Sequence, residues 1–229
     1  MSVSENDSAG DLLIQEVDED LRREQYHQLW KRYGNHAIAA ALLVILIVAG
    51  YQGWRGWQAK LRQEEGARFA AAQELVVQGK GQAALDALAK IAADGQAGFA
   101  LAARLRQADL LVAQGGTAGA VAVLEDVAKS SVPQIYRDLA VLKLALLTLD
   151  SDDPTKLELR VTPLTLASNA WRFSATEVLA LIAQKRGDAR RAGELYKQLA
   201  DDLQAPSGVR SRAAEMRALL TGDSEKPKG

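Results

Sequence analysis

The feature that most constrains this chain is an uncharged apolar run from Ala37 to Trp54, which reads AIAAALLVILIVAGYQGW. As a helix rising about 1.5 Å per residue, this run would measure roughly 27 Å, close to the ~30 Å hydrocarbon thickness of a bilayer. No other stretch of the chain is as long and as apolar. The sequence therefore predicts one transmembrane helix, which we place at residues 37–57.

Aromatic residues collect at both ends of this run. Trp30 and Tyr33 precede it, and Tyr51, Trp54 and Trp57 follow its apolar centre. Amphipathic aromatic rings favour the headgroup level of a membrane, so this placement is typical of a span and less so of a buried core helix. A cleaved signal peptide is the other alternative, but the preceding segment is long and acidic where a signal peptide is short and basic.

The segment before the run divides into two parts. Residues 1–10 are small and polar, and we expect them to be disordered. Residues 11–36 carry apolar side chains at three- and four-residue steps, which predicts an amphipathic helix at the membrane surface. Lys and Arg flank the span equally, with Arg22, Arg23, Lys31 and Arg32 on one side and Arg55, Lys60, Arg62 and Arg68 on the other. Charge alone therefore does not orient the span.

The composition of the rest of the chain argues for an all-α fold and against chemistry. Alanine and leucine dominate, there are only 5 prolines, and the net charge of −1 offers no surface for nucleic acid. There is no cysteine, and both histidines, His27 and His36, precede the span. We therefore expect no enzyme, no catalytic residue, no metal site, no cofactor and no small-molecule substrate.

After the span, glycine, aspartate and proline signals divide residues 58–221 into short amphipathic helices, and residues 222–229 form a polar tail that we expect to be disordered. Short breaks between helices imply antiparallel neighbours. The breaks are GKG at 79–81, DGQAG at 94–98, GG at 115–116, SSVP at 130–133, SDDP at 151–154, RGD at 186–188 and AP at 205–206. We expect Thr117, Asp188 and the pairs Asp152/Asp153 and Asp201/Asp202 to act as caps or turn residues.

The same region repeats with a period of 36 residues. Small residues recur in two columns and large residues in two more, so that paired helices can approach closely and stack into a common core. The small columns are Ala72, Ala108 and Ala180, with Leu144 in the third copy, and Ala84, Ala120 and Ala192, with Lys156 in the third. The large columns are Leu75, Leu111, Leu147, Ala183 and Leu219, and Leu88, Leu124 and Tyr196, broken by Arg160.

These helix pairs resemble tetratricopeptide repeats, whose usual period is 34. The resemblance implies an α-solenoid of antiparallel helix pairs. The third unit departs from it, because Pro163 falls where a second helix should continue. We expect a short helix there, an irregular turn near residues 164–169, and a new helix from about Trp171 to Lys185.

In such a solenoid the first helix of each pair lines a concave surface suited to a protein ligand. On the repeat template this surface draws on Leu105, Asp109, Val112, Val141, Ala145 and Thr148. These side chains are mostly apolar or neutral, which favours a protein segment over a phosphate group. The sequence therefore predicts a membrane-anchored protein-interaction module.

The whole layout has a narrower resemblance. An N-terminal helix ending in LWKRYG, one span ending in GYQGWRGWQ, and degenerate repeats are similar to the YfgM-like family of ancillary subunits of the bacterial SecYEG translocon. That resemblance implies a cytoplasmic N-terminus, an inner-membrane span and a periplasmic repeat domain. It also implies translocon subunits, periplasmic chaperones or client polypeptides as partners.

Two alternatives remain open at this point. The repeats could serve as a structural scaffold that oligomerises. Alternatively, a regulator or an enzyme acting on the cell envelope could place its site in the irregular third unit, where Asp152, Asp153 and Glu158 lie, with Glu177 on the next helix. The enzyme hypothesis requires that two of these carboxylates converge in one pocket.

Overall fold

The computed structural model describes the backbone of residues 4–224 and the side chains of residues 30–36, 38–40 and 42–220. Within these residues the fold is all helical, as predicted, and the chain divides into a unit of residues 1–61 and a unit of residues 62–229. The helices are α1 (Ser4–Val77), α2 (Gly81–Asp94), α3 (Ala97–Ala113), α4 (Thr117–Lys129), α5 (Gln134–Leu147), α6 (Pro154–Val161), the 3₁₀ turn η1 (Thr162–Thr165), α7 (Arg172–Lys185), α8 (Ala189–Asp201) and α9 (Ser207–Ser224).

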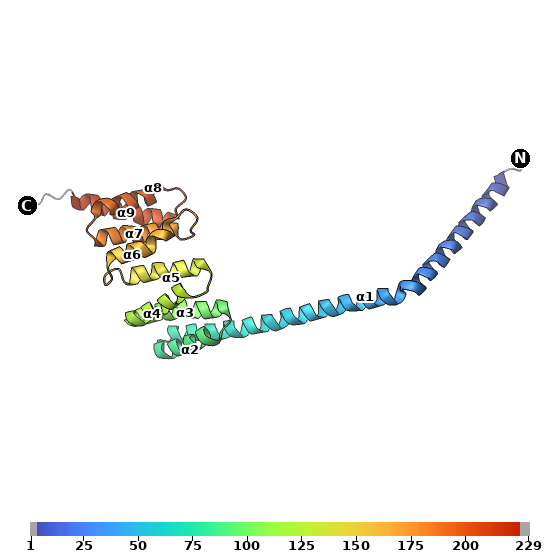
Figure 1. Cartoon of the computed structure of the whole chain (residues 1–229), viewed down its shortest axis with the longest axis horizontal. Helices are drawn as coiled ribbons and strands as arrows, with labels where there is room; N and C mark the ends of the chain where they lie inside the picture. The colour runs from blue at the N-terminus through green and yellow to red at the C-terminus, as the bar shows by residue number, and fades with distance from the viewer. Residues whose placement is uncertain (1–3, 225–229) are drawn as a thin grey trace, which may run out of the picture. The chain divides into compact units, whose positions relative to one another are not determined.

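The described part of the first unit is the stretch of α1 up to Leu61, which contains the apolar run (Figure 1). Helix α1 is long and apolar enough to cross a membrane. Its large apolar side chains are exposed, from Val48 at 47% to Leu46 at 71%, so the run is not the core of a globular unit. This exposure removes the alternative of a buried core helix.

Helix α1 is longer than the sequence analysis expected. It begins at Ser4, inside the segment expected to lack structure, and continues without a break through residues 11–36 and 37–57. The first proline of the chain is Pro133, so no residue that excludes a helix interrupts this stretch. At the other end, α9 reaches Ser224, three residues into the expected tail. Residues 1–3 and 225–229 of those two expected segments lie outside the described part.

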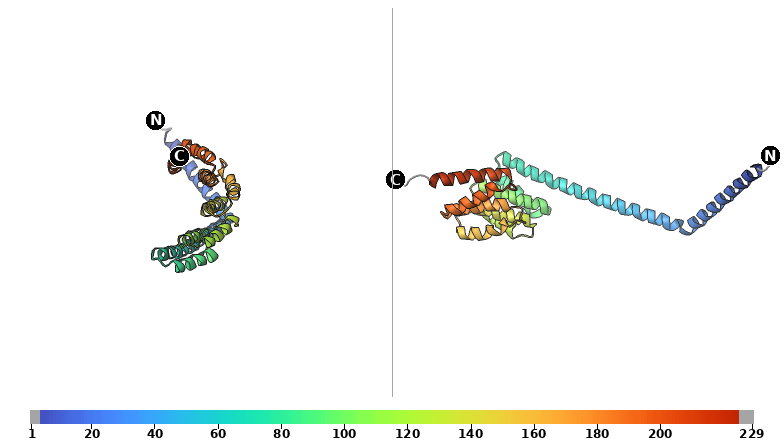
Figure 2. Two further views of the ribbon diagram at one scale, coloured as in Figure 1. Left: turned by 90° about the vertical axis from the view of Figure 1, so that its left-hand side faces the viewer. Right: turned by 90° about the horizontal axis from the view of Figure 1, so that it is seen from above.

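The second unit is a stack of antiparallel helix pairs (Figures 1 and 2). The end of α1 pairs with α2, α3 with α4, α5 with α6 and α7 with α8, and α9 packs against α8. All seven predicted breaks separate consecutive helices. Asp153 caps α6 by accepting from the Thr155 N–H at 2.9 Å, and Asp188 caps α8 in the same way. The cap predicted for Thr117 is wrong, because Thr117 is the first residue of α4 and Gly116 precedes it.

Three of the turns inside pairs have the same geometry. Gly79, Gly115 and Gly187 have φ of +72°, +78° and +77°, a conformation that costs other residues free energy. In each turn the N–H after the glycine bonds a carbonyl five residues back, for example Gly116 N to Leu111 O at 2.8 Å. The glycines are separated by 36 and by twice 36 residues, and Ser151 occupies the missing position. The period therefore marks the C-terminal ends of three first helices, α1, α3 and α7.

The core consists of equivalent buried residues from successive pairs, but the spacing between them is not constant. It is 36, then 37, then 35 residues. The extra residue enters where the connection between α4 and α5, Ser130–Pro133, is longer than the one between α2 and α3. The four columns are Ala72, Ala108, Ala145 and Ala180; Ala84, Ala120, Leu157 and Ala192; Leu88, Leu124, Val161 and Tyr196; and Ile91, Val127, Leu164 and Leu199.

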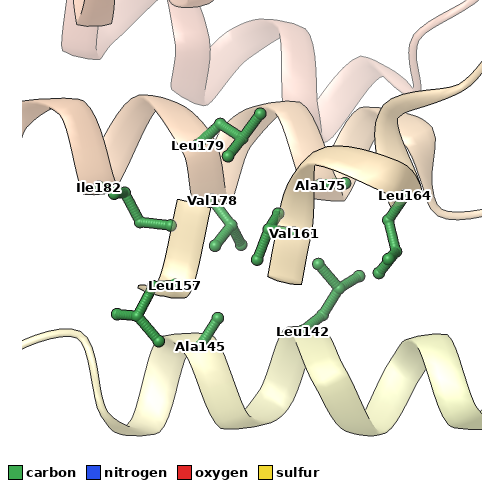
Figure 3. Packing of buried hydrophobic residues seen from close by; sticks show 9 residues of the cluster. All are labelled: Leu142, Ala145, Leu157, Val161, Leu164, Ala175, Val178, Leu179 and Ile182. Carbon is green, nitrogen blue, oxygen red and sulfur yellow. The ribbon is translucent and has the colours of Figure 1, made fainter. Parts of the chain in front are cut away.

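The third pair therefore keeps the core despite its irregular chain. Figure 3 shows Leu157 and Val161 of α6 between Ala145 of α5 and Ile182 of α7. Helix α6 ends at Val161, two residues before Pro163, and the chain continues through η1 to α7 at Arg172. The predicted short helix, irregular turn and restarted helix are all confirmed.

Candidate partner-binding face

The first helices of the pairs form one side of the second unit, which we call the inner face and define by the exposed sides of the end of α1 (residues 62–77), α3, α5, α7 and α9. Helix α7 contacts both α5 and α9 directly. Figure 2 shows that the stack of pairs is curved. Close approach of first helices places them on the inside of such a curve.

On α3, the predicted residues lie where a partner could reach them. Leu105 is half-buried, while Asp109 and Val112 are exposed. Asp109 forms an ion pair with Lys143 of α5, with 2.5 Å between Oδ1 and Nζ. These three residues therefore remain candidates for the binding surface.

On α5, the prediction needs correction. Ala145 and Thr148 are buried, at 1% and 7% exposure, and Val141 packs against the core of α6 and α7. The Thr148 hydroxyl donates to Leu144 O at 3.0 Å within its own helix. The cause is the extra residue before α5, since one residue turns a helical position by about 100°. With the spacing of 37, Leu105 corresponds to Leu142 and Asp109 to Leu146, residues that the strict 36-residue template missed.

The corrected positions line a hollow of about 380 Å³ between α5, α7 and α9. Leu146 is 50% exposed, and Trp171 and Leu181 are half-buried. The Trp171 indole N–H donates to Ile135 O at 2.7 Å, which fixes the ring against α5. The lining residues are Leu139, Leu142, Lys143, Leu146, Trp171, Ser174, Glu177, Val178, Leu181 and Arg212.

A second hollow of about 410 Å³ lies between the start of α3 and the start of α5. The predicted residue Leu105 lines it, together with Leu101, Pro133 and the exposed Tyr136. Both hollows of the inner face are therefore largely apolar.

Polar side chains on the inner face bond each other from one first helix to the next. Arg106 Nε donates to Gln73 Oε1 at 3.0 Å, and Lys143 bonds Asp109. Arg212 donates to both carboxylate oxygens of Glu177, at 2.7 and 2.8 Å. The hydrogen bond to Glu177 raises the pKa of the Arg212 guanidinium above its usual value. The charges beside the hollows thus already have partners of opposite sign.

The carboxylates of the enzyme hypothesis do not converge. Asp153 caps α6, Glu158 bonds Arg186 and Arg191, and Glu177 bonds Arg212. Among the described residues, no three histidine, aspartate or glutamate side chains come together as a possible metal site. The hollow lined by Glu158 brings it beside Asp188, Arg186 and Arg191, and not beside Asp152, Asp153 or Glu177.

Curved stacks of antiparallel helix pairs with small residues between the helices define the tetratricopeptide-like class of repeat proteins. Residues 27–158, more than half of the chain, match the family described as tetratricopeptide repeat-like domain. The chain belongs to that family. No curated protein matches it in sequence.

Two solved structures have a similar fold. Both are crystal structures of nearly identical TPR-like repeats of a putative kinesin light chain from Podosopora anserina. Their identities to this chain are 17% and 18%, with TM-scores of 0.53 and 0.51. Each alignment covers 69% of this chain and 85% of the other. At this identity the likeness concerns the fold alone.

Proposed function

We propose that this chain is a membrane-anchored, non-enzymatic protein-interaction module that receives protein partners on its inner face. The observation that supports this proposal is an exposed apolar helix followed in the same chain by a repeat unit with largely apolar hollows. Tetratricopeptide-like repeats generally mediate protein–protein contacts. A membrane tether raises the effective concentration of the repeats near other membrane components.

Within this role, we propose an ancillary function beside the bacterial SecYEG translocon, in which the repeats link secreted or membrane-protein clients to periplasmic chaperones. The support is the resemblance in layout to the YfgM-like family. In this proposal the chain lies in the inner membrane, with its N-terminus in the cytoplasm and its repeats in the periplasm. Leu105, Asp109 and Val112, together with Leu146, form the proposed contact surface.

Site-specific photocrosslinking in intact bacterial membranes tests the proposal. A benzophenone amino acid placed at Val112 or Leu146 of the inner face should crosslink to translocon subunits, chaperones or emerging clients. The matched control is Leu159 of α6, which is 72% exposed and lines neither hollow. Reproducible adducts at Leu159 but none at the inner face would contradict the proposal.

A further inference from the structure

One position of the inner face changes its chemistry along the repeats. In the first and second pairs it is Gln73 and Asp109, and in the third and fourth pairs it is Leu146 and Leu181. The two polar residues are bonded to Arg106 and Lys143 of the following first helices. After this position we call the first two pairs the polar half of the inner face, and α5, α7 and α9 its apolar half.

The apolar half is the one that contains the hollow lined by Leu139, Leu146, Trp171 and Leu181. Its volume, about 380 Å³, lies near the lower end of ligand pockets in proteins, which run from roughly 300 to 1,000 Å³. Such a hollow accommodates one or a few side chains, and not a folded element. Exposed apolar side chains around it gain free energy when a partner covers them.

Charges at the rim of this hollow argue against an ionic ligand. Lys143 bonds Asp109 at 2.5 Å, and Arg212 makes two bonds to Glu177. A carboxylate ligand would have to displace one of these internal partners, and a basic ligand would meet Lys143 and Arg212 beside the same carboxylates. Electrostatic complementarity therefore favours an uncharged ligand.

We propose that the hollow between α5, α7 and α9 binds an uncharged protein segment through one or two bulky apolar side chains, with Leu146 and Leu181 as the main contacts. This inference rests on the proposed function and specifies the chemistry of its partner. It distinguishes the apolar half from the polar half, which we expect to contribute little to such binding.

Binding of synthetic peptides to the full chain in lipid nanodiscs tests this inference. The probes are fluorescein-labelled peptides of about 14 residues that carry the same two leucines. The intervening residues are serine and asparagine in the first peptide, glutamate in the second and lysine in the third. Empty nanodiscs measure the binding of each peptide to lipid.

We expect the neutral peptide to bind most tightly, with an affinity that changes little between about 50 and 300 mM NaCl. Leu146→Asp or Leu181→Asp should weaken it by about tenfold or more, as expected when a buried apolar contact is lost. Leu159→Asp on α6, outside the proposed contact surface, should leave the affinity unchanged. Far-UV circular dichroism and the thermal midpoint check that each variant is folded.

Three results would overturn the inference. The first is tighter binding of the glutamate or lysine peptide, with an affinity that falls steeply as NaCl increases. The second is unchanged affinity of the neutral peptide for Leu146→Asp and Leu181→Asp, and the third is no binding of the neutral peptide, as when lipid fills the hollow. Crosslinks at Val112 in membranes would still support the proposed function in each case. Absent crosslinks at every inner-face position would instead contradict the proposed function, so the two failures are distinguishable.

Discussion

At the scale of single residues, Tyr196 makes the stability of the repeat unit depend on pH. Its ring fills the large column of the fourth pair, at 1% exposure, and its hydroxyl donates to Gln184 Oε1 at 2.7 Å. Burial, and secondarily the charge of Glu177, raises the pKa of Tyr196 to about 12. The unfolded chain loses this proton near pH 10, so the stabilising contribution is complete below pH 10 and is lost as pH rises through 12.

We therefore predict that the repeat unit loses about 1.4 kcal/mol of unfolding free energy through Tyr196 when pH rises from about 7 to 11. Urea unfolding of the full chain, followed by circular dichroism, measures this loss. Tyr196→Phe is the control: it should cost about 1 kcal/mol near pH 7 through the lost hydrogen bond, and should then show a smaller decrease toward pH 11. Equal decreases in both proteins would show that Tyr196 does not carry the effect.

Two glycines near the start of α8 should have opposite effects on stability when each is replaced by alanine. Gly187 has a φ of +77°, so Gly187→Ala forces a strained backbone and should cost roughly 1–2 kcal/mol. Gly193 lies inside α8 with open space around its Cα, so Gly193→Ala should stabilise by roughly 0.5–1 kcal/mol. Urea midpoints of the two variants measure both changes. A stabilising Gly187→Ala would contradict the role of the repeated glycine turn.

At the scale of elements, the irregular segment between η1 and α7 is fixed to α5 by a small polar cluster. Asp138 is buried at 5% exposure and accepts from Asn169 Nδ2 at 2.8 Å and from Gln134 Nε2 at 2.5 Å. The Asn169 side-chain oxygen accepts from the Trp171 backbone N–H at 2.8 Å. This cluster holds Trp171 at the edge of the hollow on the inner face.

Asn169→Ala should therefore cost about 1–3 kcal/mol, because Asp138 keeps its burial but loses a partner. The same variant should weaken binding of the neutral peptide, since Trp171 is no longer held in place. Ser168→Ala next in sequence is the control and should change neither property. The prediction fails if Asn169→Ala leaves both the urea midpoint and the peptide affinity at their original values.

The elements themselves could be predicted from the sequence because glycine and proline mark their ends. Pro163 indicated that α6 is short and that a new helix, α7, begins after it. The 36-residue period indicated the helix pairs. The inner face of α5 could not be predicted, because a single extra residue in the α4–α5 connection turns the helix by about 100°. Only the pattern of buried residues reveals that shift. Leu157 and Val161 of α6 are buried, each one residue after the position that the fixed period gives, Lys156 and Arg160.

The 36-residue spacing of Gly79, Gly115 and Gly187 was visible in the sequence and would have fixed the ends of three first helices. Ser151 in place of the fourth glycine marks the unit whose spacing changes. The hollow between α5, α7 and α9 had no such signal in the sequence. Its lining comes from α5, α7 and α9, which only the packing of three successive pairs brings together.

At the scale of the whole molecule, α1 and the repeat unit belong to one chain but are suited to different environments. The apolar residues of α1 are exposed in the described structure and gain free energy in lipid, while the repeat unit has its own core in water. In the proposed membrane-anchored role, a partner that binds the inner face is restricted to the neighbourhood of the membrane. Binding too weak for capture from solution can suffice there, because the tether supplies the local concentration.

The last prediction concerns this membrane attachment and its direction. The full chain expressed in bacteria should remain in the membrane pellet after alkaline carbonate extraction, as expected for a helix that spans lipid. Replacing Leu43 and Leu46 by arginine should release it, because each arginine at a bilayer centre costs about 2.5–3.5 kcal/mol. Leu159→Arg, a matched change on the exposed side of α6, should leave it in the pellet.

Protease added to spheroplasts then tests the orientation that we propose. Because the repeats are expected in the periplasm, the C-terminal unit should be degraded in intact spheroplasts, while a tag at the N-terminus is degraded only after lysis. Protection of the C-terminal unit until lysis would reverse the orientation and exclude periplasmic chaperones as partners. Since the flanking charges are equal on the two sides of the span, this experiment tests the resemblance to the translocon family independently of the positive-inside rule.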